Sequence, residues 1–128
     1  MSTTTVTTLP PTVKMEIIKG ASKTLEVTVV DKDGVAVDIT SATIYFTVKE
    51  STDATETKIA KTTAVPSQIS ITDPTNGKFR VYLVPSDTST LEVMTYVCDI
   101  WVVPTSGKHY PIISPSEFEV KPRVTDVP

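Results

Sequence analysis

The chain has 128 residues, a formal net charge of −3 and one Cys. The negative charge argues against nucleic-acid binding, which usually shows a basic patch, and the single Cys excludes an internal disulfide and a cysteine-based metal framework. No run approaches the ~20 apolar residues of a membrane span, and the first residues lack the apolar core of a signal peptide. With 23 Thr, 18 Val and 10 Pro, the composition favours β-strands over long helices. We therefore expect one soluble, non-secreted, all-β domain.

The N-terminal residues 1–14, MSTTTVTTLPPTVK, are expected to form an extended arm. The segment is polar and Thr-rich and carries Pro10-Pro11, so it cannot bury enough apolar surface to fold alone. Its residues favour polyproline or β conformations. We predict that another subunit holds this arm, and that a second extended segment, residues 122–128, leaves the fold after the last strand.

Strand patterns recur at even spacing between these two segments, with turns every ~8–12 residues. Two turns are well specified, because Gly34 ends residues 31–34, and residues 73–77 combine Pro74 with Asn76-Gly77, which tolerate positive φ. The predicted strands are residues 13–18, 23–30, 35–39, 42–49, 58–63, 67–72, 78–84, 95–103, 109–113 and 116–120. Period-two alternation turns these residues inward: Leu25, Val27, Val29, Ile44, Phe46, Val48, Phe79, Val81 and Leu83. The fold class that follows is an antiparallel Ig-like β-sandwich of about 7–9 short strands over residues 15–121, without the Cys pair of an immunoglobulin domain.

Residues 86–92, SDTSTLE, are predicted to form one helical turn that crosses from one sheet to the other. Ser86 is the expected N-cap, and Asp87 suits the N-terminal end of a helix. Farther along the chain, Pro111 and Pro115 cannot donate main-chain hydrogen bonds, so we expect the last strands to lie at sheet edges.

The stretch TYVCDIWVV, residues 95–103, is the longest predicted strand and holds the only Cys and the only Trp. Four residues share its uncharged face, which we expect to be the core face: Tyr96, Cys98, Ile100 and Val102. Asp99 then lies beside Trp101 on the outer face. Arg80, on the outer face of the preceding strand, is a candidate cross-strand partner for the Asp99 carboxylate.

Few residues in the chain could carry chemistry. Cys98 and His109 could act as nucleophile and base only if they met in space, yet Cys98 lies in mid-strand and His109 follows a loop. The DKDG stretch begins like a calcium loop but lacks its later ligands, which leaves a looser site at Asp31, Asp33 and Asp38 as an alternative to a solvated turn. We predict no enzyme activity and expect no cofactor, no metal and no small-molecule substrate.

Several stretches together form a recognisable pattern: a KG…T strand start, a D-x-x-G hairpin, a VDITxATIxF strand, a later G…L…DT…L stretch and a YxxDI strand. The matching residues are Lys19-Gly20, Thr24, Asp31 to Gly34, Val37 to Phe46, Gly77, Leu83, Asp87-Thr88, Leu91, Tyr96, Asp99 and Ile100. This pattern, spread over residues 17–121, resembles small Ig-like virion proteins of tailed phages and the N-terminal domain of phage baseplate upper proteins. Met94 departs from it, where a Gly often precedes the Tyr strand. The resemblance implies a non-enzymatic component of a phage particle.

The resemblance and the extended segments together indicate assembly. We expect a structural or accessory virion component of tail, baseplate, neck or head, assembled in the bacterial host cytoplasm. It would contact other virion proteins and copies of itself, but neither nucleic acid nor membrane, through its sandwich surface and extended segments. The predicted subunit-interface residues are Val6, Leu9, Pro10, Pro11, Trp101, Val103, Val124 and Val127. The alternative is a capsid decoration or adhesion module that binds host-surface glycans through loops 50–57, 73–77 and 104–108.

Overall fold

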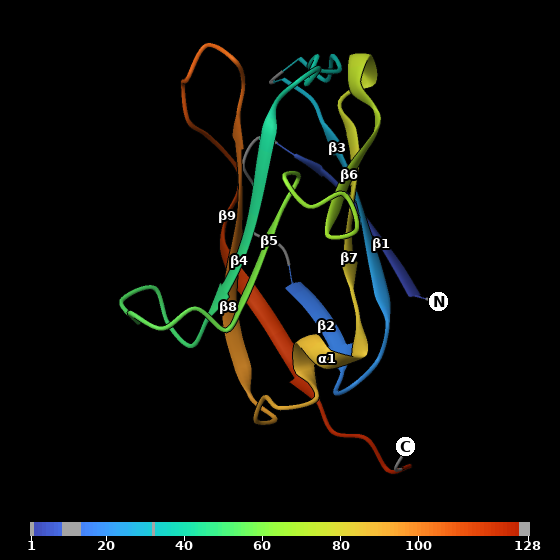
Figure 1. Cartoon of the computed structure of the whole chain (residues 1–128), viewed down its shortest axis with the longest axis vertical. Coiled ribbons are helices and arrows are strands. Elements are labelled where there is room, and N and C mark those ends of the chain that lie inside the picture. Colours follow the sequence, from blue (N-terminus) through green and yellow to red (C-terminus); the bar gives the residue numbers. More distant parts are fainter. Residues whose placement is uncertain (1, 9–13, 32, 126–128) are drawn as a thin grey trace.

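The computed structural model describes residues 2–8, 14–31 and 33–125, which form two β-sheets packed face to face (Figure 1). The four-stranded sheet has the order β1 (Ser2–Thr8), β3 (Lys23–Val29), β7 (Lys78–Leu83) and β6 (Ile69–Asp73). The five-stranded sheet has the order β2 (Lys14–Ile18), β9 (Tyr110–Lys121), β8 (Thr95–Val103), β4 (Thr43–Lys49) and β5 (Ile59–Thr62). The predicted β-sandwich is therefore confirmed.

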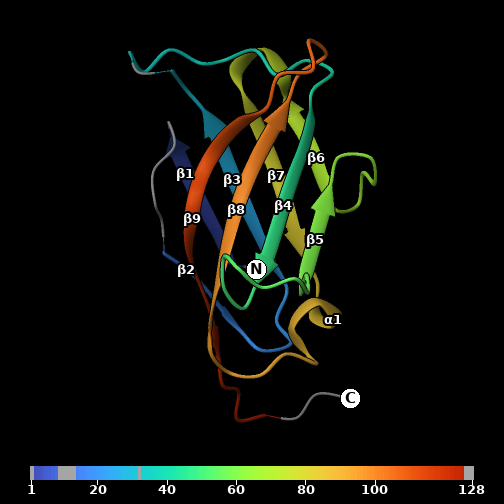
Figure 2. The ribbon, with the colours of Figure 1, turned by 90° about the vertical axis from the view of Figure 1, so that its left-hand side faces the viewer.

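The N-terminal residues form one edge strand on each sheet. β1 runs parallel to β3, from Ser2 opposite Lys23 to Thr8 opposite Val29, and β2 runs parallel to the second half of β9. Both pairs lie along the same side of the sandwich (Figure 2). In place of an arm that reaches away from the domain, residues 2–8 thus pair with their own sandwich, because Thr and Val suit a strand beside an open main-chain edge. The expected antiparallel pairing holds for the other strand pairs and is wrong for these two.

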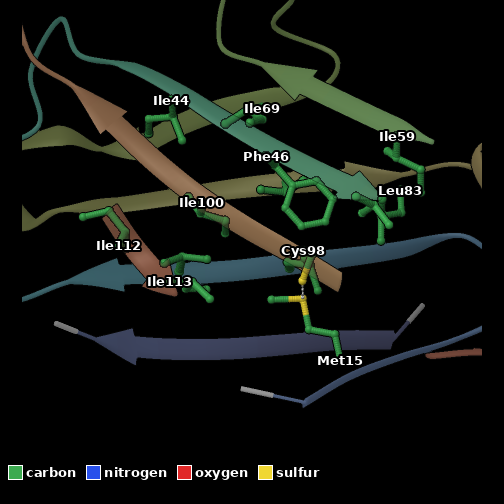
Figure 3. Close-up of a cluster of buried hydrophobic side chains, with 14 of the residues drawn as sticks. Met15, Ile44, Phe46, Ile59, Ile69, Leu83, Cys98, Ile100, Ile112 and Ile113 are labelled. Carbon is green, nitrogen blue, oxygen red and sulfur yellow. Dashed lines mark hydrogen bonds between the residues drawn. The ribbon is translucent and has the colours of Figure 1, made fainter. Parts of the chain in front are cut away.

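The core lies between the two sheets and follows the predicted alternation. All of the predicted inward residues are buried, including the uncharged face of β8. β2 adds Met15 and Ile17 to this core, and the Cys98 Sγ atom lies 3.9 Å from the Met15 Sδ atom (Figure 3). The rings of Phe46 and Phe118 pack at a tilt with their centroids 6.2 Å apart. Side chains from β2, β4, β8 and β9 therefore fill one continuous apolar layer.

Residues 35–39 do not form the predicted strand. Their pairing with the preceding strand is reduced to one bridge between Val30 and Ala36, and beyond it the Ile39 N–H donates to the main-chain oxygen of Pro74. Asp31 accepts hydrogen bonds from the main-chain N–H groups of Asp33 and Val35, and Asp38 accepts one from Thr40. These are local turns of the kind that Asp favours, and they compete with strand pairing.

The turn at residues 73–77 is confirmed. Pro74–Asn76 forms one 3₁₀ turn (η1), and Gly77 follows in the left-handed conformation with φ of 69°. A Cβ atom at Gly77 would lie 2.6 Å from the main-chain oxygen of Val29 and 2.7 Å from that of Val37. Gly77 is therefore required both for its positive φ and for the close approach of the 30–42 connection.

The crossover between the sheets contains the predicted helical turn, α1 (Pro85–Thr88). Its N-cap is Val84 and not Ser86, because Pro85 occupies the first helical position and the Asp87 carboxylate accepts the Val84 N–H at 2.8 Å. The same carboxylate lies 2.7 Å from the ammonium group of Lys61 on β5, and both side chains are largely buried. Removing one partner of such a pair typically costs about 3–5 kcal/mol, so this contact fixes the crossover against the five-stranded sheet.

The last strand is continuous, and the prediction of two edge strands is wrong. β9 lies between β8 and β2, but Pro111 and Pro115 precede the segment Glu117–Lys121 that pairs with β2. The β8 register shifts on both sides of Ile100, near the first proline. The two prolines, which have no main-chain N–H group, therefore lie in the part of β9 that does not pair with β2.

The start of β8 is fixed by a side-chain hydrogen bond. Tyr96 is buried, and its hydroxyl donates to the main-chain oxygen of Glu92 at 2.9 Å. This bond ties the crossover exit to the central strand of the larger sheet.

We expect Tyr96→Phe to lower the free energy of unfolding by about 1 kcal/mol, because it removes this hydrogen bond and leaves the ring in place. Urea unfolding followed by circular dichroism measures the change. Tyr82→Phe, which removes another side-chain hydroxyl bond, to Ser70, is the matched control for a position outside the crossover. Equal stability of Tyr96→Phe and wild type would show that the bond does not fix the start of β8.

The attachment of β2 to β9 includes an exposed charge cluster. Glu16 lies 3.1 Å from the Lys121 ammonium group and 3.8 Å from that of Lys14, which also lies 3.6 Å from Glu119. The hydrogen bond and charge of Lys121 hold the pKa of Glu16 below its ordinary value. A lowered carboxyl pKa stabilises the fold above the unfolded pKa, and that contribution is lost as the pH falls through the folded value.

We therefore expect Glu16→Gln to be less stable than wild type at pH 7, with a difference that shrinks as the pH falls below about 4.5 and Glu16 becomes protonated. Thermal unfolding across this pH range measures it, and added salt should reduce the difference at pH 7 because the cluster is exposed. A difference that persists unchanged at pH 3 would contradict an electrostatic origin.

Candidate interaction surface

The outer face of the five-stranded sheet carries an exposed apolar row across three strands. Tyr45 on β4 lies opposite Trp101 on β8, and Trp101 lies opposite Pro111 on β9. The exposed fractions of Tyr45 and Trp101 are 45% and 37%, which is high for large apolar side chains on a sheet. We call Tyr45, Trp101 and Pro111 the aromatic row. Val103, half-buried and two residues beyond Trp101, extends it along β8.

The indole ring of Trp101 is held by its neighbour. Its Nε1–H donates to the Asp99 carboxylate at 3.0 Å, which confirms that Asp99 and Trp101 lie side by side on the outer face. The predicted Arg80–Asp99 pair is wrong, because β7 and β8 belong to different sheets. Arg80 instead pairs with Glu26 on β3, at 2.7 Å. Asp99 therefore orients the ring that the row exposes.

Two hollows adjoin the row. One, of about 360 Å³, lies beyond Asp99 on the outer face and has a mixed lining that includes Thr47, Lys49 and Val97. The other, of about 470 Å³, opens at the end of the sandwich and is mostly apolar. Its lining residues are Val29, Val37, Asp38, Ile39, Ala42, Val102, Pro104, Tyr110, Pro111 and Ile112. Pro111 belongs both to the aromatic row and to the lining of this second hollow. The apolar surface therefore continues from the row into the hollow at the end of the sandwich.

The predicted interface residues do not form one patch. Trp101 and Val103 share the outer face, whereas Val124 is fully exposed beyond the opposite end of β9. Val6 lies in β1, and the remaining predictions, Leu9, Pro10, Pro11 and Val127, lie outside the described residues. The predicted set lacks Tyr45 and Pro111. The alternation of residues 42–49 places Tyr45 outward, but its alignment with Trp101 depends on the register between distant strands.

The residues considered for catalysis or metal binding do not come together in the structure. Cys98 is buried in mid-strand, whereas His109 is exposed in the loop that precedes β9. Burial raises the pKa of the Cys98 thiol to about 12, with a further contribution from Asp99, so the thiol stays protonated at neutral pH. Within residues 2–8, 14–31 and 33–125, no three His, Cys, Asp or Glu side chains cluster as metal ligands. Neither described helix is long and apolar enough to cross a membrane.

A comparison with solved structures finds a domain with a similar fold. The chain is similar to the N-terminal domain of phage TP901-1 ORF48. The TM-score is 0.61 at 12% sequence identity, and the alignment covers 94% of this chain and 99% of that chain. No protein-family model and no curated protein matches the chain. At this identity the likeness establishes a shared fold over nearly the whole of both chains.

Proposed function

We propose that this protein is a non-enzymatic structural or accessory component of a tailed-phage virion. The fold shared with the phage TP901-1 ORF48 domain carries the proposal, because the alignment spans that entire domain and leaves little of this chain unmatched. The turn and core pattern of residues 17–121, which resembles that of phage virion proteins, agrees with the proposal. In this proposal the protein assembles in the bacterial cytoplasm and resides in the particle.

The aromatic row is the surface that we assign to contact with another virion protein. Interfaces are enriched in Trp and Tyr near their centres, where few residues carry most of the binding free energy. Tyr45, Trp101 and Pro111 lie on adjacent strands of a rigid sheet, so the surface is preformed. The Asp99 hydrogen bond further limits the rotamers of Trp101, which reduces the entropy lost on binding.

We also propose that the sandwich is Ig-like. Immunoglobulin domains place strands A, B, E and D in one sheet and C, F and G in the other. The order β3, β7 and β6 corresponds to strands B, E and D, and β4, β8 and β9 correspond to C, F and G. β1 takes the place of strand A but runs parallel to β3. The hydroxyl bond from Tyr96 to Glu92, at the start of β8 and two residues before Cys98, resembles the tyrosine corner of such domains.

We expect the double substitution Tyr45→Ala and Trp101→Ala to reduce incorporation into phage particles at least about tenfold, since two central anchors would be lost. The measurement is the amount of tagged protein in particles purified after complementation of the phage that encodes the chain. Val93→Ala, at an equally exposed apolar residue away from the row, is the matched control. Full incorporation of a folded double variant would refute this surface assignment.

The glycan-binding alternative predicted from the sequence has one observation in its favour. Exposed Trp and Tyr side chains with a neighbouring carboxylate can stack on sugars and bind their hydroxyls, and Trp101, Tyr45 and Asp99 offer these groups. Trp101 is the only Trp, so its fluorescence reports directly on the row. A saturable emission change with host-surface glycans, lost in Tyr45→Ala, would favour adhesion over contact with a virion protein.

A further inference from the structure

Strand β1 pairs with one neighbouring strand, β3. It lies at the edge of the four-stranded sheet, and its pairing partner along all of Ser2–Thr8 is β3. On its other side β3 pairs with β7, so the sheet retains a neighbour for β3 if β1 leaves. β2, the next strand, is anchored separately, because Met15 and Ile17 are buried in the core. β1 can therefore separate without disturbing any other described strand pair.

β1 pairs with β3 through a parallel main-chain ladder. The hydrogen bonds of such a ladder depend on backbone groups and register, and a second copy of the chain carries the same segment with the same backbone groups. Exchange of an identical edge strand between two copies loses no pairing, which makes it a low-cost route to association. A strand of unrelated sequence would have to match this seven-residue register without that advantage.

The covalent link permits the exchange. Residues 9–13 join β1 to β2, and a six-residue step from Thr8 to Lys14 can span up to about 20 Å when extended. Adjacent strands in a sheet lie about 4.8 Å apart, so this reach covers several strand widths. We propose that β1 of one chain pairs in parallel with β3 of a second copy, and that this strand exchange links copies of the protein.

Two variants of the full chain, each with Cys98→Ala and one new cysteine, test the exchange. Thr7 on β1 lies opposite Thr28 on β3, and adjacent register partners are close enough for a disulfide. A Thr7→Cys chain is mixed with a Thr28→Cys chain at high concentration, unfolded, refolded together and mildly oxidised. Strand exchange brings the two new thiols together only between chains. We expect a disulfide-linked heterodimer on a non-reducing gel, at least about tenfold above background.

The background amount of heterodimer is measured with a second pair of variants. Thr47 faces outward on β4 in the other sheet, so Thr7→Cys mixed with Thr47→Cys reports random collision. The double variant Thr7→Cys and Thr28→Cys in one chain checks the register through closure of a disulfide, within one chain before exchange or between two chains after it. A closing double variant with heterodimer only at background would overturn the exchange, and failure of the double variant to close would overturn the pairing on which it rests. Neither outcome bears on particle incorporation through the aromatic row.

Discussion

Main-chain hydrogen bonding along one side of the sandwich is the constraint on which the rest of the structure depends. β3 and β9 would each present an open edge there, and open edges expose unpaired main-chain groups that favour aggregation. β1 covers the edge of β3, and β2 covers the edge of β9. β2 also places the side chains of Met15 and Ile17 in the core.

Local patterns could predict most of the architecture. The alternation of Ile44, Phe46 and Val48 specifies a buried face because successive side chains in a strand point to opposite sides. The parallel pairs of β1 and β2 could not be predicted, since their partners are distant in sequence and no turn sets their register. Residues 35–39 have the alternation of a strand, but Asp31 and Asp38 form local turns there, and the Ile39 N–H donates to the η1 turn.

The candidate surface was predictable only in part, for the same reason. The alternation in β8 places Asp99 and Trp101 outward together, and the structure adds the hydrogen bond between them. Pairing Arg80 with Asp99 assumed that strands consecutive in sequence are neighbours, but α1 carries the chain to the other sheet between them. Tyr45 became part of the surface through the β4–β8 register, which joins residues more than fifty positions apart.

The burial of Cys98 under Met15 has a consequence for measuring motion in this protein. The thiol is the only one in the chain, it is protonated at neutral pH, and β2 supplies the side chain that lies against it. A thiol reagent reaches such a group only while the surrounding structure is open, so the labelling rate reports how often that opening occurs. Labelling of Cys98 can therefore be used, without any added cysteine, to measure separation of β2 from the core. β2 is an edge strand of the larger sheet.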